Sequence, residues 1–518
     1  MTYARFQLAF VSLGLAVLTA CDGGEVTSDD PDVSPSVSLA TIPGCDGNAP
    51  PPALGPDPRG RDLFVHPTGK RCGSAGSRPY ATVQDAVNCS RPGDRIYLKA
   101  GDYKELKIVD YRPDLARPGR VPRHLYISGE PGARIVIDPK APLADWTSIV
   151  AIENSSYITL ANLVVTNSAL DQEVANKIGS VGIAIGGDKT PSHHISLHKV
   201  EVTGVARHAV TVNGGNSFHL ESNHFHHVAM LNKNKKLKPH DGGVATSRKD
   251  DTSCFKATWN LIHDVFGECL VAQRVSGGLL EGNEVYNCFS VNIYLDSSEN
   301  VQVSRNYVYA NDPASEYFRE GKAAIGLAIA KETAEGYPAR NHEITNNAFH
   351  HLAIGIYYGH WEYTGADNYY SGIRIAHNVI KEMALISLGV EVPWSDQPGL
   401  NRIENNIIFK PWDPEGSAVQ LDIKPPMDET GWPTPAWEVS HNLFPNGVPG
   451  TRGDDGTNLA GDPLFVPFDG PTHDIDRFKI DPDSRAAGAG RATPVAKDYW
   501  YAPRNATAPS IGIHEPAQ

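Results

Sequence analysis

The sequence has 518 residues, a formal net charge of −14 and seven cysteines. An acidic chain is a poor general partner for nucleic acid, because phosphate backbones attract basic surfaces, and we expect no such partner. This length would normally predict more than one domain, unless the chain grows by stacking repeats.

The first 21 residues, MTYARFQLAFVSLGLAVLTAC, carry one basic residue, Arg5, and then an apolar run. This pattern predicts a secretory signal, and the run is too short to act as a membrane span. The ending LTAC (residues 18–21) resembles the lipobox of bacterial lipoproteins, which implies a lipid on Cys21. An ordinary signal peptide is the alternative. We therefore expect an exported protein that is anchored by lipid in the bacterial cell envelope.

Residues 22–58 are dominated by proline, glycine, serine and aspartate, so they are predicted to be a disordered linker before a folded domain at 59–518. In an oxidising compartment, the cysteines of this part of the chain are expected to form disulfides. Cys72 and Cys89 flank the first folded segment and are a candidate pair. The pairing of the others stays open: Cys45, Cys254, Cys269 and Cys288.

A unit of 23 residues repeats in the middle of the chain: the phrases NLIH, NEVY and NYVY start at Asn260, Asn283 and Asn306. Each unit holds short segments that alternate apolar and polar residues, such as VNIYLD, which starts at residue 291. Period-two alternation predicts strands with one buried face. Three short strands per unit, with no helix between them, predict an all-β parallel β-helix from about Asp62 to Pro467.

An asparagine recurs at the corner between the second and third strands of each coil. We expect a left-handed backbone at this residue, and hydrogen bonds between stacked asparagine side chains along the axis. Lys199 replaces the asparagine once. The corner positions are Asn162, Asn223, Asn260, Asn283, Asn306, Asn347, Asn378, Asn406 and Asn442.

The segment YATVQDAV (80–87) predicts a short helix with Thr82 as its N-cap, directly before the first strand, RIYLKAG (95–101). Such a helix can cover the open end of the solenoid. The opening segment DLFVHPTGKRCGSAGSRPYATVQDAVNCSRPGDRIYLKAGDY resembles that of the pectate-lyase-like right-handed parallel β-helix superfamily. The closing segments DPLFVPFDGPTHDIDRFKIDPDSRAAGAG and APSIGIHE also resemble it. The resemblance covers roughly residues 62–516 and implies the fold. It leaves the activity open among polysaccharide lyases, glycoside hydrolases, epimerases and inactive members.

The resemblance also implies that carbohydrate lies along the outward face of the first strand of each coil. In VNIYLD, Ile293 and Leu295 point inward by alternation, so Asn292, Tyr294 and Asp296 point outward. The outward positions of the other coils are mostly small residues. We expect a shallow floor for a glycan, unless the protein's own loops cover it.

Charged residues flank these strands on both sides. Before the strands stand Arg207, His208, Lys238, His240, Asp241 and Glu268. After them stand Lys189, Arg248, Lys249, Arg274, Asp296 and Lys331. Cations along one rim of an acidic protein predict a local site for anions.

We therefore predict a monomeric polysaccharide lyase that cleaves an acidic, uronate-containing glycan by β-elimination. The reaction needs a base, a cation that stabilises the enolate, and an acid for the leaving group. The catalytic candidates are His240, Lys249, Glu268, Arg274 and Tyr294. The substrate-binding candidates are Arg207, His208, Lys238, Asp241, Arg248, Asn292 and Asp296. No cofactor is required, although Ca²⁺ held by Asp241 or Glu268 is an alternative neutraliser.

Two other functions stay open. A glycoside hydrolase would use Asp241 and Glu268 as its carboxylate pair, since Glu268 and Asp296 are predicted to lie too far apart. A non-catalytic surface lipoprotein would bind a glycan or a protein along the solenoid. The third strands also predict an outward stack, which we interpret as structural. With His227 and Asp264 it would otherwise offer a metal site, although its spacing matches no metal motif. Its members are His226, His263, Tyr286, Tyr309 and His350.

Overall fold

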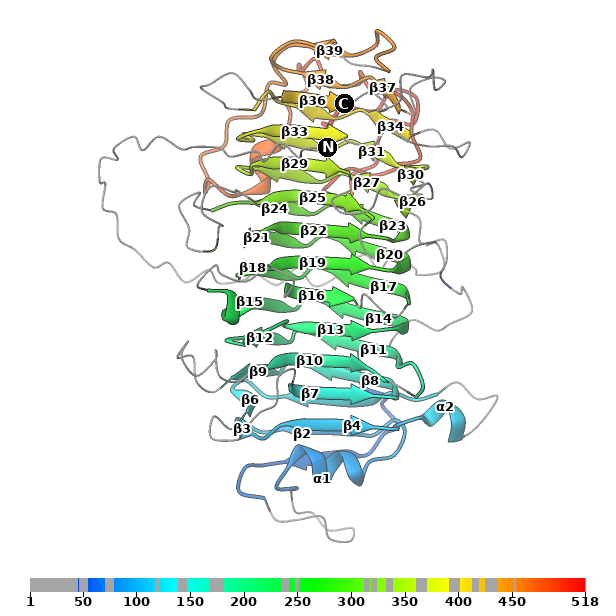
Figure 1. Ribbon diagram of the computed structural model, residues 1–518, viewed down its shortest axis with the longest axis vertical. Coiled ribbons are helices and arrows are strands. Elements are labelled where there is room, and N and C mark those ends of the chain that lie inside the picture. The colour runs from blue at the N-terminus through cyan, green and yellow to red at the C-terminus, as the bar shows by residue number, and fades with distance from the viewer. Residues whose placement is uncertain are drawn as a thin grey trace, which may run out of the picture.

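The structure is a computed structural model in which the chain winds as a solenoid of parallel strands (Figure 1). It describes residue 45 and residues 55–69, 79–116, 122–137, 147–167, 180–187, 189–233, 242–246, 251–311, 317, 324–331, 339–359, 370–390, 401–411, 419–423, 437–450 and 453–517. Cys21 and the predicted signal lie outside these residues. Among the described residues, no helix is long and apolar enough to cross a membrane.

Most coils contribute one strand to each of three sheets, in the order sheet C, sheet A, sheet B. Sheet C consists of β4 (Leu106–Val109), β7 (Ser148–Glu153), β10 (Val181–Gly186), β13 (Val210–Asn213), β16 (Gly242–Thr246), β19 (Glu268–Gln273), β22 (Val291–Asp296), β25 (Ile325–Ala330), β29 (Ile354–Tyr358), β33 (Ile386–Val390) and β36 (Val419–Ile423).

Sheet A holds the second strand of each coil, together with the two strands that open the chain. It consists of β1 (Asp62–Val65), β2 (Arg95–Leu98), β5 (Leu125–Gly129), β8 (Ser156–Ala161), β11 (His193–His198), β14 (Gly215–Glu221), β17 (Thr252–Thr258), β20 (Val275–Glu281), β23 (Glu299–Ser304), β26 (Ala339–Arg340), β27 (Glu343–Thr345), β30 (Tyr370–Ser371), β31 (Arg374–Ala376), β34 (Asn401–Glu404) and β37 (Trp437–Ser440).

Sheet B holds the third strand of each coil and lies on the left-hand side of Figure 1. It consists of β3 (Gly101–Tyr103), β6 (Ala133–Ile137), β9 (Val164–Asn167), β12 (Glu201–Thr203), β15 (His224–Val228), β18 (Leu261–Val265), β21 (Glu284–Cys288), β24 (Tyr307–Tyr309), β28 (Ala348–His350), β32 (Val379–Lys381), β35 (Ile407–Ile408), β38 (Leu443–Phe444) and β39 (Leu459–Ala460).

The core runs down the axis between the three sheets. The alternation predicted for VNIYLD is confirmed, because Ile293 and Leu295 of β22 belong to this core whereas Tyr294 does not. Each inward side chain stacks on its counterpart one coil away, as Leu270 does on Ile293. Burial of these inward apolar side chains between neighbouring coils is the main stabilising term of the fold.

The asparagines form a continuous internal ladder. The Oδ1 atom of Asn283 accepts from the backbone N–H (3.0 Å) and Nδ2 (2.9 Å) of Asn260, and Asn306 does the same for Asn283. The ladder continues through Asn347, Asn378, Asn406 and Asn442 to Asn458, a position that the sequence analysis missed. The predicted hydrogen bonding along the axis is therefore confirmed.

The predicted backbone conformation is wrong for most of these asparagines. The left-handed residue is the one before the ladder position, as at Trp259 (φ 56°) and Arg305 (φ 54°). Asn162 and Lys199 themselves have the left-handed conformation. The ladder position in the coil of Lys199 is therefore the next residue, Val200, whose N–H donates to Asn223. The turn must bend one residue earlier, because the ladder side chain has to point back into the coil to reach its neighbour.

A short helix, α1 (Val83–Asn88), covers the first coil as predicted. The Thr82 hydroxyl accepts from the Asp85 N–H (3.0 Å), and Val83, Ala86 and Val87 are buried. The prediction that the first strand follows this helix is wrong, because β1 precedes it and pairs with β2. Other short helical segments are α2 (Pro113–Ala116), η2 (Met230–Asn232) and η3 (Ile475–Phe478).

The closing segment after β39 folds back over sheet B. Phe478, Ile480 and Ile511 pack on Tyr307, Tyr309 and the aliphatic side chains of β28, β32 and β35. Arg305 at the turn after β23 donates to the Asp498 carbonyl (2.9 Å), which ties this segment to the middle of the solenoid. The lower strands of sheet B, from β12 to β21, have no residue in this apolar contact except Tyr286.

Disulfides join Cys45 to Cys254 and Cys269 to Cys288. Cys89 is also disulfide-bonded, but Cys72 lies outside the described residues, so the candidate pairing of these two stays a prediction.

Candidate functional site

Four consecutive strands of sheet C, β13, β16, β19 and β22, carry or adjoin the candidate residues. Five candidates lie outside the described residues: Lys238, His240, Asp241, Arg248 and Lys249. The described candidates fall into three groups, namely those before the strands, those on the outward face and those after the strands.

The first group lies where the strands begin. Val210 pairs with Val244, which brings His208 level with Gly242, and Gly242 in turn pairs with Glu268. His208 and Glu268 are therefore two coil steps apart, about 10 Å. His208 is buried, and its Nδ1 accepts from the Gly242 N–H (2.8 Å), whereas Arg207 and Glu268 are partly exposed.

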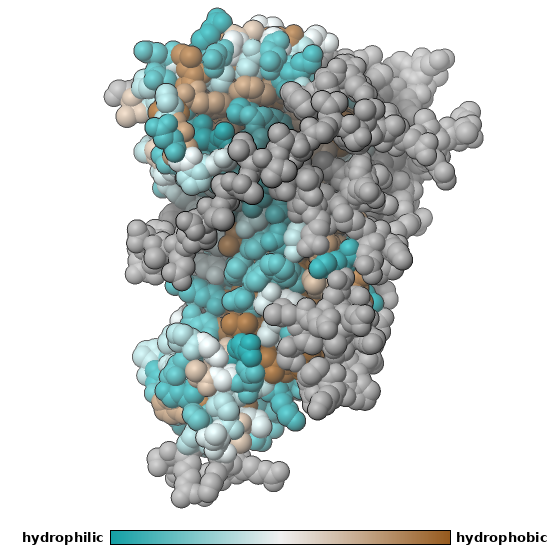
Figure 2. All heavy atoms as spheres, turned by 90° about the vertical axis from the view of Figure 1, so that its left-hand side faces the viewer, coloured by the Kyte–Doolittle hydropathy of each residue, from teal (hydrophilic) through white to brown (hydrophobic). Residues whose placement is uncertain are grey.

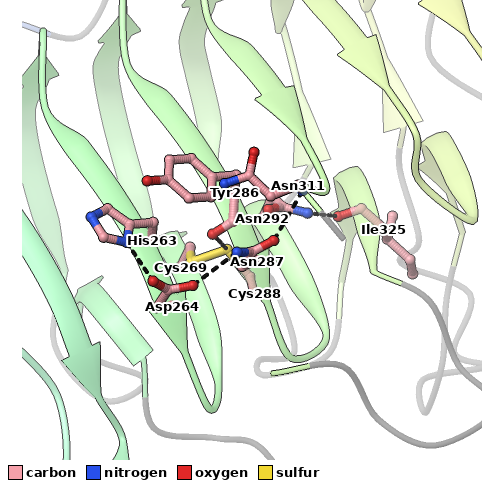
Figure 3. The surroundings of a disulfide bond; sticks show 9 residues. All are labelled: His263, Asp264, Cys269, Tyr286, Asn287, Cys288, Asn292, Asn311 and Ile325. Atoms are coloured by element: carbon pink, nitrogen blue, oxygen red, sulfur yellow. Dashed lines mark hydrogen bonds and ion pairs between the residues drawn. A yellow bond between two sulfur atoms is a disulfide. The ribbon is translucent and has the colours of Figure 1, made fainter. Parts of the chain in front are cut away.

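The outward face of β22 is buried, so the expected open floor is not present at these positions. Asn292 and Asp296 are 0% exposed and Tyr294 is 1% exposed. Asn292 donates to the Ile325 carbonyl (2.9 Å; Figure 3), and Tyr294 packs in a second apolar cluster with Val271. Tyr294 therefore does not face solvent as a general acid in this arrangement.

The third group lies where the strands end, and its charges are already partnered. Arg274 has φ of 51° and donates to Asp251 from Nε (2.9 Å) and Nη2 (2.6 Å). The Asp296 carboxylate accepts from the Gln273 amide and from the Ser297 hydroxyl (2.9 Å). Lys331, expected on the same rim, is buried. The rim is thus less positive than the sequence suggested.

One carboxylate pair is excluded as a hydrolytic dyad. Glu268 begins β19, and Gln273 at its other end pairs with Asp296. Five residues of strand separate the two levels by about 16 Å. Hydrolytic pairs lie at most about 10 Å apart, so the predicted separation of Glu268 and Asp296 is confirmed.

A polar cluster on sheet A escaped the sequence analysis. His219 lies 3.0 Å from Glu221 (Nε2 to Oε2), and Lys256 pairs in register with His219 on the next coil. Burial lowers the pKa of Lys256 and of His219. Alternation along β14 and β17 places these side chains on the outward face, and this pattern could have indicated the cluster. An outward lysine on a strand, however, is ordinarily interpreted as solvent-exposed.

The outward stack on sheet B is present as predicted. The ring centroids are 5.2 Å apart for His226 and His263, 4.6 Å for His263 and Tyr286, and 4.8 Å for Tyr286 and Tyr309. The next ring on Tyr309 is His473 of the closing segment (4.8 Å), not His350. Figure 2 looks onto this side of the molecule and shows hydrophilic atoms gathered midway along it.

The disulfide between Cys269 and Cys288 ties sheet B to sheet C beside this stack (Figure 3). Cys269 on β19 is fully buried. The link fixes the turn between β21 and β22 against the preceding coil.

Comparison with known proteins agrees with this architecture. The family model described as "Right handed beta helix region" matches residues 148–347. No curated protein matches the sequence.

Solved structures with a similar shape have little sequence in common with this chain. The pectate lyase Pel9A is 14% identical with a TM-score of 0.46, over 93% of this chain and 100% of its own. PfbA, a surface adhesin of Streptococcus pneumoniae, is 14% identical with a TM-score of 0.49, over 70% and 86%. A polygalacturonase from Erwinia carotovora ssp. carotovora is 9% identical with a TM-score of 0.37, over 72% and 97%.

At these identities and TM-scores the solved structures carry no argument about activity. The three stacked parallel sheets, the asparagine ladder and the family-model match over residues 148–347 show that this chain folds as a right-handed parallel β-helix.

Proposed function

We propose that the protein acts on an acidic, uronate-containing polysaccharide by β-elimination. The observation that carries the proposal is the placement of partly exposed charges at both ends of neighbouring sheet C strands. Arg207 and Glu268 lie where the strands begin, and Arg274 with Asp251 lies where they end. A glycan chain that crosses several coils would meet charged groups at both edges of the sheet.

In this reaction a base removes the proton on the carbon next to the sugar carboxylate. The bond to the 4-linked oxygen then breaks, that oxygen takes a proton, and the ring keeps a new double bond. Arg274 is the described cation suited to neutralise the carboxylate, because guanidinium binds carboxylate in two-point fashion. His240 or Lys249 would act as the base. Ca²⁺, with Glu268 among its ligands, is an alternative to Arg274 for neutralising the carboxylate.

The ion pair of Arg274 with Asp251 does not block this role. The Asp251 side chain is 62% exposed, so the pair is a surface salt bridge worth about 0–1 kcal/mol. A substrate carboxylate can take the place of Asp251 at little cost. Burial of Tyr294 removes the leaving-group acid that the sequence suggested, which leaves water or His240 for that step.

The test is a screen of acidic polysaccharides with the mature protein, with and without a chelator. Near-ultraviolet absorbance from the unsaturated product is the expected result. New reducing ends without absorbance would instead indicate a hydrolase, and binding without either would indicate a non-catalytic glycan-binding protein. Absence of all three signals across the screen contradicts the proposal.

Variants assign the role of Arg274 in any activity found. Arg274→Ala and His240→Ala should each lower turnover by about 100-fold, the usual scale for a charge-stabilising or acid–base group. Asp251→Ala removes this ion pair and should keep or raise activity. Arg340→Ala is the matched control, because it removes a similar ion pair with Glu299 on sheet A. Equal losses in the Arg274 and Arg340 variants would show a merely structural effect.

We also propose that the mature chain is exported and held by a lipid on Cys21 in the bacterial cell envelope. The lipobox-like ending of the first 21 residues supports this proposal. Such a placement would put the solenoid where extracytoplasmic polysaccharide is available.

A further inference from the structure

Three histidines gather on the outer face of sheet B, away from the proposed glycan site. His224 and His226 are two residues apart on β15, so both point outward, and His263 of β18 pairs in register with His226. One nitrogen from each ring lies within 4.8 Å of the others, and the Nε2 atoms of His224 and His263 are 2.7 Å apart. All three are partly exposed, so an ion can reach them from solvent.

The hydrogen bonds around His263 decide which nitrogen is available. Its Nδ1 lies 2.9 Å from the Asp264 carboxylate, which Asn287 holds from the other side (Nδ2 to Oδ1, 2.8 Å; Figure 3). A carboxylate can only accept, so Nδ1 carries the proton and Nε2 of the neutral ring keeps its lone pair. A carboxylate behind an imidazole is the usual outer partner of a metal-binding histidine.

A carboxylate lies beside one of the three histidines. Glu201 of β12 lies 3.3 Å from His226 (Oε1 to Nε2), on the coil that precedes the histidines.

The chain holds a second histidine cluster that lacks these properties. His350 and His351 both contact one oxygen of Glu382 (2.5 and 2.6 Å), and Lys381 donates to its other oxygen (2.8 Å). An ammonium group on the same carboxylate opposes a further cation. With His473 of the closing segment, this cluster is better explained as a polar clamp that holds the segment against sheet B.

We propose that His224, His226 and His263 form a binding site for a borderline divalent metal ion such as Zn²⁺, with Glu201 as a fourth ligand. Three imidazole donors select Zn²⁺, Cu²⁺ or Ni²⁺ over Ca²⁺ and Mg²⁺, which prefer oxygen. The stacked aromatic ladder from Tyr286 upward holds His263 in place from the neighbouring coil.

Isothermal titration of the full chelator-treated chain with ZnCl₂ tests the proposal. We expect one Zn²⁺ per chain, together with the visible absorption bands of a tetrahedral site when Co²⁺ replaces Zn²⁺. His263→Phe keeps the ring that stacks on Tyr286 but removes both nitrogens, and it should weaken binding at least tenfold. His224→Phe provides a second, independent variant, and Asp264→Asn should weaken Zn²⁺ by about 10–100-fold through lost orientation.

His351→Phe is the matched control, because it alters the other cluster and should leave the affinity for Zn²⁺ unchanged. The proposal is overturned if the wild-type chain takes up no Zn²⁺, or if both phenylalanine variants bind it as the wild type does. It is also overturned if His351→Phe abolishes binding, which would place the ion in the other cluster. The wild-type Co²⁺ spectrum decides the ligand type even where a variant fails to fold.

Discussion

Replacement of one ladder asparagine should destabilise the whole solenoid. In Asn283, the Nδ2 group donates to the Ala257 carbonyl and to Asn306 Oδ1 (both 2.9 Å). Its Oδ1 atom accepts from the backbone N–H (3.0 Å) and Nδ2 (2.9 Å) of Asn260. The residue is 1% exposed, so water does not readily replace these bonds in Asn283→Ala.

The cost follows from the groups that lose a partner. Asn260 Nδ2 keeps its bond to the Leu220 carbonyl (3.0 Å), and Asn306 Oδ1 keeps the backbone N–H of residue 283 (3.0 Å). Without the Asn283 side chain, the backbone N–H of Asn260 loses its acceptor and the carbonyl of Ala257 loses its donor. At about 1–3 kcal/mol for each buried unsatisfied group, the free energy of unfolding should fall by about 2–6 kcal/mol.

Urea denaturation followed by circular dichroism measures this loss, and hydrogen exchange at the Asn260 amide localises it. Asn216→Ala is the matched control, because Asn216 is exposed on β14 and should change stability by less than about 0.5 kcal/mol. Asn283→Asp should cost at least as much as alanine, since its second oxygen would face two acceptors. A loss below about 1 kcal/mol in Asn283→Ala, with unchanged exchange at Asn260, would refute the argument that the ladder stabilises the coils.

Four further predictions concern other parts of the chain. Burial lowers the pKa of His342 to about 4 from an ordinary value of 6.5, so the unfolded chain binds protons that the folded chain refuses between these values. Stability should therefore fall as pH drops from about 6.5 towards 4, and a flat urea midpoint over that range would contradict this reasoning. Removing the disulfide in a Cys269→Ala/Cys288→Ala chain opens a loop of 19 residues and should cost about 3 kcal/mol by the same urea assay. Arg504 is buried and donates to Asn346 and to the Gly512 carbonyl, so Arg504→Ala should release the closing segment. Limited proteolysis would show earlier cleavage of that segment, and an unchanged pattern would argue against its anchoring role. Finally, mass spectrometry of the native N-terminus should find a lipid on Cys21, whereas an unmodified terminus elsewhere would indicate ordinary secretion.

The regular features of the fold were decided by the sequence alone. Alternation in VNIYLD places Ile293 inside and Tyr294 outside, because successive side chains of a strand point to opposite faces whatever surrounds them. The 23-residue spacing of Asn260, Asn283 and Asn306 predicts their stacking for the same local reason, and the helix cap at Thr82 depends on three neighbouring residues only.

The candidate sites depended on contacts between distant segments, which only the tertiary structure supplies. Whether outward Tyr294 is exposed depends on what lies over sheet C. Arg274 was predicted as a catalytic cation, and the sequence did not indicate that Asp251, 23 residues before it, partners it one coil away. The partner of Cys269 was one of several cysteines, and only the winding of the chain brings Cys288 to it. Strand alternation likewise predicted His263 in a stack but did not point to His224, because their nitrogens converge diagonally between two coils and not along one register. Strand periodicity is a property of the backbone, whereas burial, charge pairing and convergence of side chains are set by how the coils stack.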